Sequence, residues 1–142
     1  MEDIAHRPEP PAESLRWDRV LPWRARLAAE VTGRRIPPER QPDGVFTVGH
    51  AVLSRTAAAF MAMLYDESVV AGFDWPGWME HRGRELATTR ELLEGASLED
   101  CRRLLAALVR ADRFNEGALL GALEGGLVDA TLGRIERLIV AQ

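Results

Sequence analysis

The feature that most constrains the fold of this chain is an apolar stripe with helical spacing over residues 98–109. Its apolar members recur every three or four residues, and they are Leu98, Cys101, Leu104, Leu105, Leu108 and Val109. Charged residues fill the opposite face, at Glu99, Arg102, Arg103 and Arg110. Residues at this spacing share one face of an α-helix. The pattern therefore predicts an amphipathic helix with Cys101 buried on its inner face.

Capping signals and weaker stripes predict further helices. Ser54 and Asp74 are suitable N-caps, and residues 88–91 and 97–100 resemble capping boxes. Pro22 must start, kink or divide the first helix. The first expected helix begins after Ser14 or Asp18 and runs to about Val31. The other expected helices cover residues 54–65, 75–86, 88–95, 98–111, 113–124 and 128–140. Two short strands are expected over residues 45–48 and 69–71. We predict a mainly α fold, a compact orthogonal domain of five to seven helices with at most one short two-stranded β ribbon.

Length and composition set the domain organisation. A chain of 142 residues is the size of one domain. Residues 1–13 combine three prolines with charges and have little to bury, so we predict a disordered N-terminal arm followed by a single domain over 14–142. Residues 33–43 contain three more prolines without periodicity, which indicates a surface loop.

The charge balance argues against some classes of partner. Twenty-two acidic residues face eighteen basic ones, a net charge of −4, whereas nucleic-acid-binding chains usually carry a basic excess. We therefore do not expect nucleic acid as the partner, although Arg34, Arg35 and Arg40 cluster locally. The longest apolar run, residues 57–64, is far shorter than the roughly 20 residues of a membrane span. A single cysteine and no visible signal peptide favour a cytoplasmic location.

Residues 110–117, with the sequence RADRFNEG, are the first candidate site. If the helix that starts at residue 98 simply continued, Asp112 and Glu116 would enter the core at a cost of several kcal/mol. One interpretation is a structural corner, in which Asp112 caps a new helix and charges pair. The other is a polar pocket, built with Arg110, in which Arg113 holds a small anion and Asp112 or Glu116 orients it.

Residues 73–78, with the sequence FDWPGW, are the second candidate. Trp75 and Trp78 lie three residues apart beside the carboxylate of Asp74. Such a pair could stack on a ligand and form one wall of the pocket around residues 110–117. Aromatic residues of this kind more often anchor a loop into the core.

The sequence gives little support for a metal site or for a familiar catalytic motif. His81 and Glu85 share a helix face, but zinc sites need three or four protein ligands. The chain has no G-x-S-x-G, P-loop or G-x-G-x-x-G motif. We therefore assign no catalytic residue, metal or cofactor.

The two candidate segments together resemble an uncharacterised bacterial family catalogued as a domain of unknown function. The resemblance runs from about Leu15 to the C-terminus. Family members often have cysteine where this chain has Asn115, which argues against a thiol nucleophile at that position. The resemblance implies a single bacterial domain and carries no activity.

Two function classes remain. We favour a non-enzymatic interaction or accessory module with a protein partner or self-association. The alternative is a small-molecule or anion binder, in which an enzymatic activity could reside, built around the RADRFNEG segment.

Overall fold

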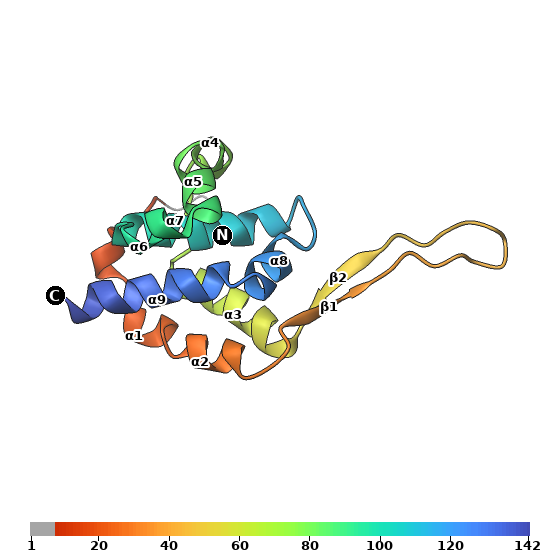
Figure 1. The fold of residues 1–142 in the computed structure, drawn as a ribbon, viewed down its shortest axis with the longest axis horizontal. Helices are drawn as coiled ribbons and strands as arrows, with labels where there is room; N and C mark the ends of the chain where they lie inside the picture. The colour runs from red at the N-terminus through yellow and green to blue at the C-terminus, as the bar shows by residue number, and fades with distance from the viewer. Residues whose placement is uncertain (1–7) are drawn as a thin grey trace.

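Helices make up most of the structure, a computed structural model that describes residues 8–142. The prediction of a mainly α fold with one short β ribbon is confirmed (Figure 1). In chain order the elements are η2 (Ala12–Ser14, a 3₁₀ turn), α1 (Trp17–Val20), α2 (Trp23–Ala28), β1 (Gly33–Ile36), β2 (His50–Leu53), α3 (Arg55–Asp66), α4 (Trp75–Glu80), α5 (Arg82–Thr88), α6 (Arg90–Glu94), α7 (Leu98–Asp112), α8 (Ala118–Glu124) and α9 (Leu127–Val140).

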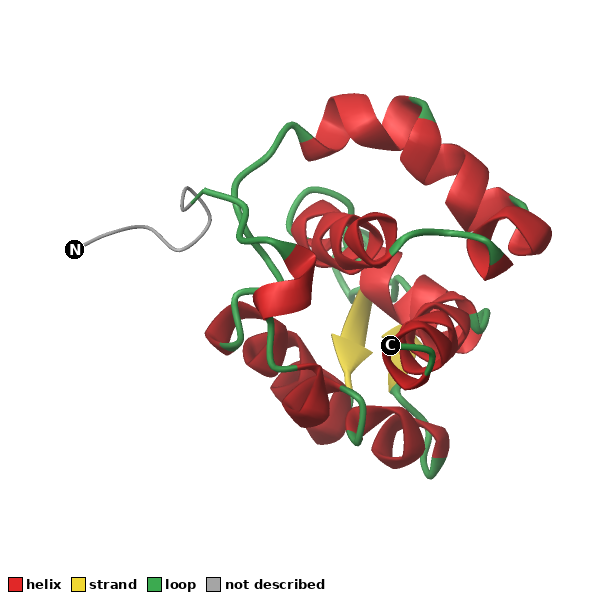
Figure 2. Cartoon of the chain, turned by 90° about the vertical axis from the view of Figure 1, so that its left-hand side faces the viewer, coloured by secondary structure: helices red, strands yellow, loops and turns green. Residues whose placement is uncertain are grey.

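Helix α7 is the central element of the core. It contacts α4, α5, α8 and α9, and its apolar stripe is almost completely buried. Figure 2 shows the helices of the described chain from the end opposite to the hairpin loop. Cys101 is buried, as predicted, and burial raises the pKa of its thiol to about 12. The prediction that Arg102 lies on the exposed face is wrong, because its side chain is fully buried.

Three helix starts follow the capping signals in the sequence, at Ser54, Asp74 and Ser97. The hydroxyl of Ser54 accepts the N–H of Ala57 at 3.0 Å, and the hydroxyl of Ser97 accepts the N–H of Asp100 at 3.0 Å. These bonds satisfy backbone donors that the first helical turn leaves without partners. The capping box expected at residues 88–91 is wrong, since the Thr88 hydroxyl donates to the carbonyl of Arg84 one turn back in α5.

Two expected helices are divided. Pro22 cannot donate a backbone hydrogen bond, so the first helix separates into α1 and α2 around Leu21–Pro22. The helix expected over residues 75–86 breaks at His81, which has the non-helical angles φ −124° and ψ −98° between α4 and α5.

The β ribbon lies elsewhere than the sequence predicted. β1 pairs antiparallel with β2, with Gly33 opposite Leu53 and Ile36 opposite His50. In the described chain neither residues 45–48 nor residues 69–71 form a strand. Residues 69–71 are buried instead directly after α3, where the N–H groups of Val69 and Val70 donate to the carbonyl of Leu64.

A long hairpin loop extends the ribbon away from the helices (Figure 1). We call residues 37–49 the arm. Backbone hydrogen bonds between residues 39 and 47, and between 41 and 45, close its outer part. Pro37 and Pro38 separate this outer part from the ribbon, and they face Gly49, where an added Cβ would lie 2.9 Å from Pro38 Cδ.

The N-terminal segment makes contact with the helices. The first part of the predicted disordered arm, residues 1–7, lies outside the described residues. Ala12 is buried in the core, and its carbonyl accepts the indole N–H of Trp17 at 2.8 Å. Ala12 therefore packs as part of the helical body.

Candidate functional site

The RADRFNEG segment forms a turn between α7 and α8. Helix α7 continues to Asp112, and the next helix begins at Ala118 rather than at residue 113 as expected. Asp112 Oδ1 accepts the N–H of Leu119 at 3.1 Å, in the first turn of α8. A carboxylate at a helix N-terminus satisfies a free N–H and interacts favourably with the helix dipole. Of the two interpretations of this segment, the contact agrees with the structural corner, in which Asp112 caps a new helix.

Glu116 connects the same turn to the hairpin. Its Oε1 accepts the backbone N–H of Ala51, in β2, at 3.2 Å. Beside it lies an open cavity of about 500 Å³, between the root of the hairpin and the turn. Its polar lining residues are Arg35, His50, Asn115 and Glu116, and the rest of its wall comes from residues 36–38, 49, 51 and 117–118.

Trp75 lies against the same turn. Its ring stacks on Phe114, with centroids 6.1 Å apart and planes inclined by 26°. Phe114 is 77% exposed. Asp74 caps α4 through the N–H of Gly77 at 3.2 Å. The two sequence segments are therefore in contact, as their joint assignment to one site required.

Trp78 and the two arginines occupy different surroundings. Trp78 packs edge-on against Phe73 at 6.1 Å and contacts the core, which is the anchoring role that the sequence left open. Arg113 is exposed, and Arg110 is half-buried in the last turn of α7. Of the seven predicted residues, all of them described, only Glu116 lines the cavity beside the turn.

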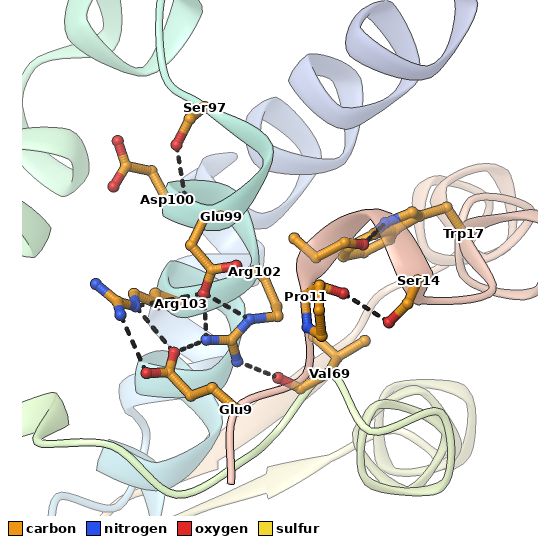
Figure 3. A network of polar contacts seen from close by, with 11 residues as sticks. Glu9, Pro11, Ser14, Trp17, Val69, Ser97, Glu99, Asp100, Arg102 and Arg103 are labelled. Carbon is orange, nitrogen blue, oxygen red and sulfur yellow. Dashed lines mark hydrogen bonds and ion pairs between the residues drawn. The ribbon is translucent and has the colours of Figure 1, made fainter. Parts of the chain in front are cut away.

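A buried ionic cluster, which the sequence did not predict, lies along the first turns of α7 (Figure 3). Arg102 donates to the carbonyl of Val69 at 3.1 Å, to Glu99 at 2.6 and 3.0 Å, and to Glu9. Arg103 binds both carboxylate oxygens of Glu9, at 2.9 and 3.0 Å. Burial lowers the pKa of Arg102 to about 10. The Glu99 spacing to both arginines was visible in the sequence, but Glu9 is more than ninety positions away.

The arm carries the largest group of exposed apolar side chains within a short stretch of the described chain. Val45, Phe46 and Val48 are 62%, 63% and 86% exposed. Arg40 is exposed and forms a β-bridge with Phe46, so a cation and an aromatic ring lie on adjacent limbs of the arm tip. Single exposed apolar residues are common on proteins, whereas large contiguous apolar patches are rare on the surface of monomeric soluble proteins.

A second feature of the surface is a groove between α1–α2 and α9. The groove encloses about 600 Å³, and its lining residues are Asp18, Leu21, Pro22, Arg24, Ala25, Ala28, Asp129 and Glu136. Arg24 binds Asp129 at 2.8 Å and Glu136 at 2.9 Å, which fixes the rim on the α9 side. The side chain of Asp18 is 64% exposed on the other side.

Among residues 8–142, no three His, Cys, Asp or Glu side chains gather closely enough to hold a metal ion. No helix in this part of the chain is long and apolar enough to cross a membrane.

Fold and surface together define a mainly helical domain from which one β-hairpin arm projects. The chain belongs to a family of unknown function, DUF6508, whose pattern matches residues 12–141. No curated protein and no solved structure matches it. The resemblance seen in the sequence is thus confirmed at the level of an uncharacterised family, while the bacterial source stays an expectation.

Proposed function

We propose that the chain is a non-enzymatic interaction module that binds a partner protein through its arm. The observation that carries this proposal is the exposure of Val45, Phe46 and Val48 on a segment that projects from the helical body. Apolar groups gain about 25 cal/mol for each Å² that a partner removes from water. Three such side chains on one projecting segment therefore favour binding to an apolar surface.

The isolation of the arm supports the same conclusion. A two-stranded hairpin that stands alone is marginally stable in water, and it becomes stable when a further strand or a helix covers it. The arm buries almost none of its own side chains, since every residue from 37 to 48 is exposed. A partner surface would supply the missing cover.

Site-specific photo-crosslinking tests the proposal in the source cells. A photoreactive phenylalanine analogue at Phe46 should form a covalent adduct with a protein, whereas the same analogue at Arg84, an exposed residue of α5, should not. Circular dichroism of both variants verifies that the helices are intact. Absence of any adduct at position 46, or adducts with nucleic acid alone, would refute binding of a protein by the arm.

A small-molecule site is the second candidate, supported by the cavity at the hairpin root. Ligand pockets commonly enclose about 300–1,000 Å³ and contain a few polar groups that converge. Arg35, His50 and Glu116 provide such groups. A thermal-shift screen of small carboxylic acids, amides and phosphate esters should identify a ligand whose effect Glu116→Gln reduces. If no compound raises the melting temperature of the parent protein, this candidate fails.

A further inference from the structure

We propose that the first turns of α7 carry a binding site for a small carboxylate, formed by Arg102, Arg103 and the ring of Phe73. Glu9 fills this site in the structure as a ligand tethered to the same chain (Figure 3). A free monocarboxylate takes its place when the carboxylate of Glu9 is removed. The site shares no residue with the arm, so its test is independent of the proposed function.

The carboxylate of Glu9 is bound by three nitrogen atoms. Arg103 donates from Nε to Oε2 at 2.9 Å and from Nη2 to Oε1 at 3.0 Å, and Arg102 donates from Nη2 to Oε2. Two parallel bonds from one guanidinium to both oxygens are the fork geometry by which arginine recognises a planar carboxylate. The site is therefore fitted to the shape of a carboxylate as well as to its charge.

Arg102 is held in position by contacts that do not involve its ligand. It is fully buried, and it donates to the carbonyl of Val69 at 3.1 Å and to Oε1 of Glu99 at 2.6 and 3.0 Å. The ring of Phe73 lies 5.7 Å from Cζ of Arg102 and 5.5 Å from Cζ of Arg103, within the range of cation–π attraction. Arg102 would thus keep its place in the absence of the ligand.

The charge balance of the cluster depends on the ligand. Two guanidinium groups face one carboxylate from the helix itself, that of Glu99. Asp100, the next carboxylate along α7, pairs with Arg82 at 3.0 Å instead, and in the described chain the exposed Glu13 bonds to neither arginine of the cluster. Removal of the Glu9 carboxylate therefore leaves one surplus positive charge beside a buried guanidinium. Since an unpaired buried charge is strongly destabilising, an anion that enters the site stabilises the fold.

The site is open to water along one edge, and no backbone pairing closes it. The side chain of Glu9 is 22% exposed, and that of Arg103 is 34% exposed. No backbone–backbone hydrogen bond of the described chain involves residues 8–10, two of which are prolines without an N–H. The Glu9 carboxylate can therefore be removed without the loss of a backbone hydrogen bond.

Calorimetric unfolding of the full chain with Glu9→Ala tests the site, with sodium acetate as the probe. Alanine removes one methylene group and the carboxylate, and acetate matches these atoms in size. Melting temperatures in acetate are compared with those in sodium chloride of the same ionic strength, as the excess over the shift of the parent. Acetate at about ten times its dissociation constant should favour the folded state about tenfold, which raises the melting temperature by about 4 °C.

Matched proteins provide the controls. The parent reports the general effect of acetate on stability, because Glu9 already occupies its site. Glu13→Ala removes an exposed carboxylate from the same segment and should behave as the parent does. Glu9→Ala combined with Arg103→Gln lacks the fork and should lose most of the rise. If Glu9→Ala is unfolded in chloride, the same acetate should restore its helical circular dichroism.

The other outcomes overturn the inference. If acetate raises the melting temperature of Glu9→Ala no more than that of the parent, or leaves an unfolded variant unfolded, no carboxylate binds and the arginines only attach the N-terminal segment. If the double variant keeps the rise, acetate acts elsewhere on the protein. If sodium phosphate of the same ionic strength stabilises Glu9→Ala as strongly as acetate does, the site selects charge alone, and the stated class of ligand is wrong.

Discussion

Replacement of Glu9 by alanine should destabilise the protein far more than its position near the N-terminus would indicate. Glu9 accepts hydrogen bonds from Arg102 and from two nitrogens of Arg103 (Figure 3). Arg103 is about one-third exposed, so water can replace the lost carboxylate there. The Arg102 side chain is fully buried and water cannot reach it, although Glu99 and the carbonyl of Val69 remain as partners.

The magnitude follows from these remaining partners. A buried charge that loses its only partner costs about 3–5 kcal/mol, and a hydrogen bond to a charged group contributes about 1.5–3 kcal/mol. Because Arg102 keeps Glu99, we expect Glu9→Ala to lower the free energy of unfolding by about 2–3 kcal/mol. In a domain of this size the melting temperature would fall by about 5–10 °C.

Differential scanning calorimetry provides the measurement, with two comparisons. Glu9→Gln keeps an acceptor without the charge and should fall between the parent and Glu9→Ala. Arg16→Ala removes an ion pair to Asp18 in which both side chains are more than half exposed, and it should leave the melting temperature close to that of the parent. A Glu9→Ala protein that melts with the Arg16→Ala control would refute the view that Glu9 neutralises a buried arginine.

Three further predictions concern single residues. Asp112→Ala removes the acceptor for the first turn of α8 and should lower the free energy of unfolding by about 0.5–2 kcal/mol in urea denaturation, whereas Arg113→Ala, at an exposed position, should not; equal losses would contradict the capping role. Cys101 should react slowly with a thiol reagent in the native protein, because its thiol is buried and its pKa is raised to about 12; labelling as fast as in urea would place it on the surface. The hydrogen bond from Arg24 lowers the pKa of Asp129, so the stability that this pair contributes is present above the usual carboxyl pKa of about 3.9 and is lost as the pH falls through the lowered value. The difference in unfolding free energy between the parent and Asp129→Asn should therefore shrink during acid titration, and a constant difference would contradict the linkage.

The elements that the sequence predicted correctly are those that local interactions decide. The stripe of α7 and the caps at Ser54, Asp74 and Ser97 involve residues within a few positions of one another. The position of the ribbon was predicted wrongly because β1 finds its partner across the arm, and its sequence GRRI has no alternation of apolar and polar residues. Strand pairing of this kind depends on contacts distant in sequence, which no local pattern records.

The candidate site shows the same difference between what local patterns predict and what depends on contacts distant in sequence. The contact between the FDWPGW and RADRFNEG segments was anticipated, and it is made by Trp75 and Phe114. The burial of Arg102 was not, since a charged residue at the edge of an apolar stripe normally faces solvent. Its interior position depends on Glu9, which only the folded chain brings to α7.

The residues at the base of the outer arm, Pro37, Pro38 and Gly49, have a consequence for the proposed binding by the arm. Pro37 and Pro38 fix φ near −65° in one limb, whereas the facing limb passes through Gly49, which tolerates many backbone conformations. Flexing of the outer arm is therefore concentrated in a single limb, and the number of orientations that the tip samples in solution is restricted. An arm that samples few orientations loses little conformational entropy when it is captured, so more of the apolar contact energy remains as affinity. Replacement of both prolines by alanine would leave Val45, Phe46 and Val48 unchanged and still weaken the proposed capture, because the limb would become more flexible.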